Sequence, residues 1–288
     1  MRKSVKKKSK AENIEPVKLW KLFQLFVVSS FAAVFAFTLV WFLTNWSALY
    51  FAYDFNIPGH FNLSGLFFDA DKTSPLWTFD ATVTILLSRP VAALLIAVLS
   101  LGAFVFIKRK LISFFFFLFW MNVLSFNIAL GGLVDDAIVG SGTYDVLMLL
   151  KLNLTVVVFS SLVIIYFLYR VGIINFYVIA ASFPERYFVN PQGRFIFLMM
   201  AVVLPWLLLF TFPSFDNSTG YTLLGLLKNM SVMVILLPAF FLKPAKGQMA
   251  HLEIIQMPQK FDWLSLVLFA TGTFLLYYFM VDGVYLYA

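Results

Sequence analysis

Five ionisable residues lie inside or beside long apolar stretches of this chain, where a charge is costly and its type is therefore informative. Arg89, Lys151 and Lys228 are embedded in such stretches, and Asp135 and Asp136 close another. Cations that face carboxylates inside a membrane can neutralise them as ion pairs between helices. Where water enters, the same cations can bind an anionic lipid headgroup or solute. These five residues are the candidate ligand-binding residues of the sequence.

The composition indicates what kind of protein must position them. Of 288 residues, 62% are hydrophobic and 12% are charged, whereas a soluble chain carries roughly a quarter of its residues as charged side chains. The apolar residues occur in blocks of the length, about 20 residues, that crosses the hydrocarbon core as a helix. We therefore predict an all-α, polytopic transmembrane helical bundle, integral to the bacterial inner (plasma) membrane.

The apolar blocks predict about seven spans. They run at about 20–46, 82–107, 111–134, 147–169, 195–212, 222–242 and 263–281. Residues 1–19 form a basic tail that we expect to be disordered and cytoplasmic, and residues 20–288 form a single transmembrane domain. The pair Gly131-Gly132 permits close helix approach, but we expect it to end the third span.

The distribution of charge predicts the topology, because Lys and Arg concentrate in cytoplasmic segments. With the N-terminus inside and seven alternating spans, 17 of the 21 Lys and Arg residues fall in inner segments. The C-terminus is then outside. The basic tail either acts as this topology signal or binds anionic lipid of the inner leaflet. No folded soluble module is predicted, so we expect no nucleic-acid partner.

This topology places the five candidate residues near the outer side. Counted inward at 1.5 Å per residue, Arg89 lies roughly 10 Å deep, Lys228 roughly 9 Å and Lys151 roughly 6 Å. The third span delivers Asp135 and Asp136 to the same outer edge. We call these five residues the outer charged layer. They could form interhelical ion pairs, surround a water-accessible anion pocket, or snorkel to the outer surface.

The residue types that most enzymes use are scarce. The chain has no Cys and only His60 and His251, which the topology places on opposite sides, so they cannot share a metal. HExxH and GxSxG motifs are absent. Asp135 and Asp136 point about 100° apart on a helix and do not naturally share one proton. We therefore predict no catalytic residue, no metal and no cofactor.

Two short motifs within about residues 86–145 resemble intramembrane zinc metalloproteases of the site-2 protease class. LLSRPVAALL resembles their small-Gly-Pro motif, with Arg89 in the place of the glycine and Pro90 retained. FNIALGGLVDD resembles their later segment, with Asn127 eight residues before Asp135. By this resemblance Asp135 would match the aspartate zinc ligand. The first span has no His or Glu, so the chain looks like a relative that has lost zinc.

Together these observations predict a non-catalytic subunit of a membrane complex, or a binding protein for lipid or peptide. One alternative is a transporter or lipid-handling protein with an outer cationic pocket, which helices broken at Pro90, Pro205 and Pro238 would suit. Another alternative is a degenerate intramembrane hydrolase. The expected partners are the lipid bilayer, a membrane protein, and an anionic lipid or solute.

Overall fold

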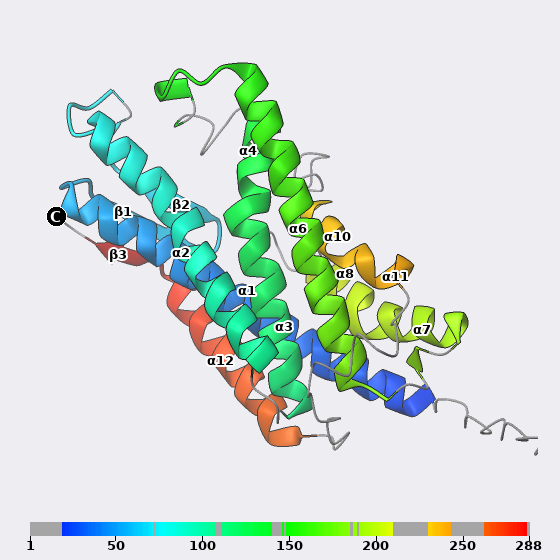
Figure 1. Cartoon of the computed structure of the whole chain (residues 1–288). Helices are drawn as coiled ribbons and strands as arrows, with labels where there is room; N and C mark the ends of the chain where they lie inside the picture. Colours follow the sequence, from blue (N-terminus) through cyan, green and yellow to red (C-terminus); the bar gives the residue numbers. More distant parts are fainter. Residues whose placement is uncertain are drawn as a thin grey trace, which may run out of the picture.

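The computed structural model is a bundle of long helices with one small β-sheet at one end (Figure 1). It describes residues 19–71, 73–106, 111–139, 146, 148–184, 187–188, 190–209, 230–242 and 262–286, without the side chains of Asp135, Val139 and Met230. In these residues six helices are long and apolar enough to cross a membrane, and Ser231–Phe241 is a shorter apolar helix. The architecture is helical, as predicted. The N-terminal tail and Lys228 lie outside the described residues.

Helix α1 (Leu19–Asp54, 36 residues) is the longest element and extends beyond the predicted end of the first span at 46. It continues because no Pro or Gly interrupts the chain before Pro58. At about 54 Å it exceeds the hydrocarbon thickness of about 30 Å. Ala32 and Ala36 are fully buried, and small residues of this kind let neighbouring helices approach closely. Helices α2, α3 and α12 all pack against α1.

The second and third spans form the centre of the bundle. Helix α2 (Phe79–Phe106) packs on α3 (Ile112–Phe126), which continues through a π-helix, η1 (Asn127–Gly131), into α4 (Gly132–Val139). The glycine pair that was expected to end this span therefore lies inside it. The α3–η1–α4 span is 83% buried over its most apolar window, whereas the α2 window is 22% buried. The third span is thus the core, and most residues of α2 are half-buried or exposed.

Helix α6 (Leu154–Ser182, 29 residues) differs from the predicted span at 147–169 at both ends. It starts late because Asn153 caps it, accepting a hydrogen bond from the backbone N–H two residues later. Lys151 lies in the preceding turn, exposed and with φ 52°, and is not embedded as expected. The helix continues past Arg170, where the prediction had ended the span.

The fifth predicted span is a helix with a π-helical turn, and the described part of the sixth is a helix with a one-residue break. α7 (Pro191–Leu198) leads through a π-helix, η3 (Met199–Val203), into α8 (Leu204–Leu209). Further along the chain, α10 (Met230–Leu236) is separated from α11 (Pro238–Phe241) by one residue. Both α10 and α11 pack against α6.

The side chain of Arg194 joins α7 to the end of α11. Its guanidinium donates hydrogen bonds to the backbone oxygens of Leu242, at 2.6 Å, and Phe240, at 2.9 Å. The last carbonyls of a helix have no intrahelical partner, and a cation there also interacts favourably with the helix dipole. Arg194 therefore caps α11 from a neighbouring helix.

Helix α12 (Trp263–Val281) covers the residues predicted for the last span and packs mainly on α1. The rings of Phe35, Phe117 and Phe269 stack on one another with centroids 5.4–5.6 Å apart. Gly272 makes room for this stack, because a Cβ there would lie 2.5 Å from the ring of Phe35. Aromatic packing thus holds α12 against α1 and α3.

A three-stranded antiparallel sheet, which was not predicted, closes one end of the bundle. Its order is β2 (Gly65–Phe68), β1 (Gly59–Asn62), β3 (Val284–Leu286). Phe61 of β1 is fully buried in a cluster with Met280 of α12 and residues of α1. The sheet therefore brings the C-terminal ends of α1 and α12 together, and these two helices run in the same direction (Figure 1).

Candidate functional site

Arg89 lies deep in the bundle, on α2. It follows Phe79, the first residue of α2, by ten positions, roughly 15 Å along the helix axis, which is deeper than expected because α2 begins earlier than predicted. Its Cζ lies 5.4 Å from the ring centroid of Trp41 on α1. Both side chains are half-buried. A guanidinium over an indole face is an attractive cation–π contact, so Trp41 holds Arg89 against α1.

The rest of the outer charged layer is only partly described. Asp136 is half-buried on α4, which contacts η1, and η1 in turn contacts the helix of Arg89. Lys151 lies at the outer end of α6 and not within its span. Asp135 is in α4 but its side chain is outside the described residues, as is all of Lys228. The prediction that all five meet therefore stays a prediction.

A chain of amide hydrogen bonds crosses the bundle at one depth. Asn175 of α6 donates through Nδ2 to Oδ1 of Asn122 on α3, at 3.0 Å. Asn122 donates through its own Nδ2 to the backbone oxygen of Ala97 on α2, at 3.2 Å. All three residues are buried. Hydrogen bonds between membrane helices fix their relative positions, so this chain sets the register of α2, α3 and α6.

A second polar contact lies at the π-helix of the third span. Ser231 of α10 donates a hydrogen bond through Oγ to Oδ1 of Asn127, the first residue of η1. Gly131 allows this approach, because a Cβ there would lie 2.3 Å from Ser231 Oγ. A Cβ at Gly132 would meet nothing within 4 Å. Single π-helical turns are frequent at functional sites, and this one is where α10 reaches the core.

A third contact links α1 to the other π-helix. Trp120 of α3 donates through Nε1 to Ser29 Oγ, at 2.9 Å. Ser29 donates in turn to the backbone oxygen of Ala201 in η3, at 2.6 Å. Each of the three contacts thus connects different spans.

His60 is part of the sheet. Its ring lies between those of Phe67 and Tyr285, with centroids 5.3 Å and 4.9 Å away. Its Nδ1 lies 3.6 Å from Oδ1 of Asp69. Phe67 and Tyr285 belong to the two strands on either side of β1, and Asp69 directly follows β2, so His60 helps to hold the sheet together. In the described part of the chain no group of three or more His, Asp or Glu could hold a metal ion.

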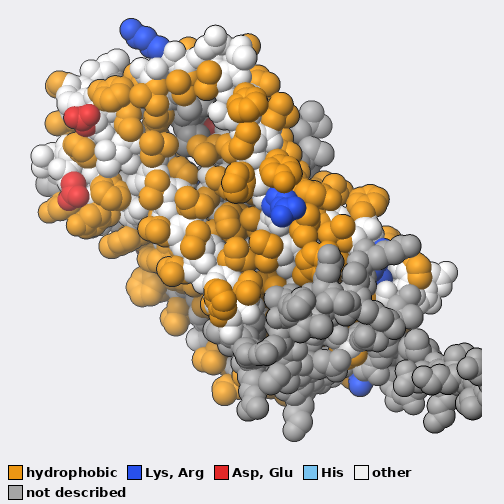
Figure 2. Space-filling model, in the orientation of Figure 1, with side chains coloured by type: hydrophobic (Ala, Val, Ile, Leu, Met, Phe, Trp, Pro, Cys, Tyr) orange, Lys and Arg blue, Asp and Glu red, His pale blue; other side chains and the backbone are white. Residues whose placement is uncertain are grey.

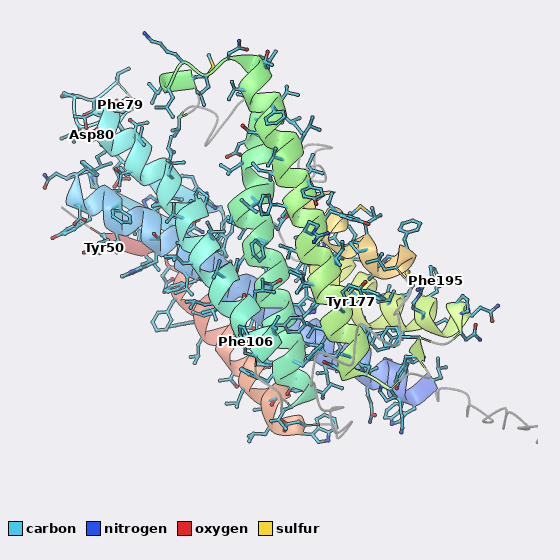
Figure 3. All side chains as sticks on the ribbon, in the orientation of Figure 1. Tyr50, Phe79, Asp80, Phe106, Tyr177 and Phe195 are labelled. Carbon is cyan, nitrogen blue, oxygen red and sulfur yellow. The ribbon has the colours of Figure 1, made fainter. Side chains whose placement is uncertain are left out.

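The exterior of the helix bundle resembles a surface that faces lipid. Figure 2 shows a face that is hydrophobic over most of its area. In Figure 3, Phe79 and Asp80 mark one end of α2 and Phe106 the other, with Tyr177 and Phe195 toward the same end as Phe106. Aromatic side chains at both ends of a bundle are typical of the two membrane–water interfaces.

Arg170 is a residue that the sequence prediction assigned to an inner segment and that the structure assigns to the middle of a helix. It lies on α6 and is exposed. The signal was present in the sequence, because the eleven residues that follow it contain no charge and no proline. Arg170 was missed because a charged residue was taken as the boundary of the span.

Comparison with protein-family models, curated proteins and solved structures finds no match for this chain. The resemblance to site-2 proteases therefore rests on its two short motifs alone. The residues and contacts described above are the basis for any functional conclusion.

Proposed function

We propose that this protein is a multi-pass membrane protein with a non-catalytic binding role, either as a subunit of a membrane complex or as a binding protein for lipid or peptide. The observation that carries the proposal is Arg89, a cation within α2, ten residues after its start, that lies against the ring of Trp41. A charge at the centre of a membrane helix costs about 2.5–3.5 kcal/mol on insertion scales. Such a residue is retained where it binds something.

The geometry supports an acidic ligand. The cation–π contact with Trp41 orients the guanidinium against α1. Arg89 is half-buried, and few residues of α2 are fully buried. A carboxylate or phosphate can therefore approach from the membrane and accept paired hydrogen bonds from the guanidinium. We propose Asp135, Asp136, Lys151 and Lys228 as its neighbours toward the outer surface.

The proposal includes a topology of seven spans, with the N-terminus cytoplasmic and the C-terminus outside. Helices α1 and α12 run in the same direction and meet the same sheet. If both cross the membrane, the chain crosses it an odd number of times from the start of α1 to the end of α12. The six long helices are candidate crossings, and we propose the segment that contains Ser231–Phe241 as the seventh.

The test is ligand retention by the full-length protein. The wild type is purified in mild detergent from membranes that contain phosphatidylglycerol and phosphatidylethanolamine, and retained molecules are identified by native mass spectrometry. We expect a retained acidic lipid or peptide that Arg89→Gln loses and Arg89→Lys partly keeps. Lys21→Gln is the control, because it removes one positive charge from an exposed position on another helix, α1. Unchanged retention in Arg89→Gln, together with lower thermal stability, would mean that Arg89 serves packing only.

A transporter or lipid-handling role is the second candidate, favoured by the break in the sixth span. Pro238 begins α11 after the break at Leu237, and Pro205 is the second residue after η3 in the fifth span. Interrupted helices form the binding sites of many transporters. Reconstituted vesicles with fluorescent phosphatidylglycerol in both leaflets separate the two roles. Lipid handling exposes more than half of the probe to an external quencher, whereas a binding role leaves about half protected.

Kinship with site-2 proteases is a further proposal and is compatible with a binding role. In that case Asn127 at the start of η1, and Asp135 in α4, descend from the aspartate-bearing segment of that family. Zinc analysis of the purified protein tests whether activity was lost with the metal. Stoichiometric zinc would instead favour a hydrolase.

A further inference from the structure

Arg170 is an exposed cation on a helix face that is otherwise apolar. The side chains on the same face of α6 three and four residues away, Phe167, Tyr166 and Ile174, are all exposed. Figure 2 shows that the face of the molecule that carries α6 is hydrophobic over most of its area. The contacts of α6 with α10 and α3 lie at Gly172 and Asn175, about 200° and 140° around the helix from Arg170.

The position of Arg170 along its own helix places its backbone inside the hydrocarbon layer. It lies sixteen residues after Leu154 and twelve before Ser182, roughly 24 Å and 18 Å along the axis. The hydrocarbon layer is about 30 Å thick. In any placement that keeps both boundaries of the layer on α6, the Arg170 backbone stays at least about 6 Å inside the hydrocarbon.

The amide chain through the bundle gives the same depth independently. The hydrogen bonds from Asn175 through Asn122 to Ala97 mark one level of α6, α3 and α2. Ala97 lies nine residues, roughly 14 Å, from the end of α2 at Phe106. On α6, Arg170 precedes Asn175 by five residues. It therefore lies roughly 8 Å from the level of the amide chain, on the side away from Phe106. Both counts put Arg170 near the middle of the bundle.

We propose that this face of α6, centred on Arg170, docks a transmembrane helix of another protein that carries an Asp or Glu near the middle of the bilayer. Charge complementarity selects this occupant. A guanidinium surrounded by lipid tails is unfavourable, and a lipid phosphate lies at the bilayer surface. A carboxylate on a partner helix at the same depth neutralises the charge and accepts paired hydrogen bonds. The inference names a partner for the proposed role as a subunit, and its geometry is independent of Arg89.

A second copy of this chain fits the face poorly. A symmetric pair of α6 helices would place Arg170 against Arg170, two like charges in a medium of low dielectric constant. Every Asp whose side chain is described lies in a loop or within about one turn of the end of a helical span. None of those carboxylates is at the depth of Arg170.

The test uses the full-length protein in phosphatidylcholine vesicles with a defined probe. The probe is a leucine-rich single-span peptide with one Glu at its centre, and the matched control peptide has Gln there. Association is measured by energy transfer between labelled protein and labelled peptide. We expect the Glu peptide to bind wild type at least about tenfold more tightly than the Gln peptide, the equivalent of about 1.4 kcal/mol.

The variants locate the site. Arg170→Gln should lose the preference for the Glu peptide, and Arg170→Lys should keep part of it. Lys21→Gln, on another helix, should keep it. A preference lost in Arg89→Gln but kept in Arg170→Gln would assign the peptide to the proposed ligand site at Arg89 and overturn this inference, so the failures of the two proposals are distinguishable. Equal binding of the two peptides to wild type, which needs no variant to fold, would overturn the proposal. So would self-association of the protein, or enrichment of phosphatidylglycerol around it, that depends on Arg170 while the Glu peptide is ignored.

Discussion

The two adjacent glycines of the third span should respond in opposite ways to the same substitution. Both lie within one turn of helix, at the junction of η1 and α4. A Cβ at Gly131 would lie 2.3 Å from Oγ and 2.7 Å from Cβ of Ser231, whereas a Cβ at Gly132 would meet nothing within 4 Å. Gly131→Ala should therefore destabilise the fold, and Gly132→Ala should be neutral or stabilising.

The magnitude follows from the geometry. Nonbonded carbon atoms are normally about 3.5–4.0 Å apart, so η1 and α10 must separate by about 1 Å to admit the methyl group of Gly131→Ala. Overpacking of this kind costs about 1–3 kcal/mol, and weakening the bond between Ser231 and Asn127 costs about 0.5–1.5 kcal/mol more. The better helix propensity of Ala returns about 0.5–1 kcal/mol at either position. The net change in the free energy of unfolding is about 1–3 kcal/mol of destabilisation for Gly131→Ala.

The assay is thermal unfolding of the full-length variants in one detergent, followed by tryptophan fluorescence. We expect the midpoint of Gly131→Ala to fall and that of Gly132→Ala to stay or rise. Removing the side chain that blocks the methyl group, by Ser231→Gly in the Gly131→Ala background, should cost less than the two single changes added together. Shifts of equal sign and size for Gly131→Ala and Gly132→Ala would refute the close contact between η1 and α10.

Two further predictions concern the contacts that hold the sixth span. Gly172→Ala should lower the unfolding midpoint, because its Cβ would lie 2.1 Å from a backbone oxygen of α10. Gly102→Ala is the control and should not lower it, because a Cβ there meets nothing within 4 Å. Equal midpoints for the two variants would contradict the α6–α10 packing. Arg194→Lys keeps the charge but loses paired donation to the oxygens of Phe240 and Leu242. Hydrogen exchange in α11 should then accelerate, and unchanged protection would mean that Arg194 does not cap this helix.

Hydropathy predicted most of the helices because a stretch of about 20 apolar residues crosses a membrane as a helix, which satisfies its own backbone polar groups. It predicted their ends poorly. α1 passes its expected end because nothing in its sequence breaks the helix, and α6 passes Arg170 because one charge does not end a helix that can continue. Lys151 lies outside the span because Asn153 caps α6 and starts the helix later than the apolar residues suggest.

The sheet and the interhelical contacts could not be predicted from periodicity. β1 pairs with β3, more than 200 residues away, and short strands with few residues carry little pattern. The roles of Asn122 and Asn175 depend on which helices are neighbours, which a single sequence does not state. For the candidate site, the sequence indicated Arg89 from its cost in a membrane, but its contact with Trp41 required the packing of α1 on α2.

The new position of Arg170 tests the reasoning behind the proposed topology. Moving it out of the inner segments leaves 16 of the 21 Lys and Arg residues there, so the charge bias that favours a cytoplasmic N-terminus persists. The parity of the spans comes from a different source, the sheet that joins the ends of α1 and α12. Because the two arguments are independent, losing one arginine from the count does not weaken the other. It adds, besides Arg89, a second cation that lies within a helix and not at its end, and the proposed binding of acidic partners would offset the cost of placing such charges in a membrane.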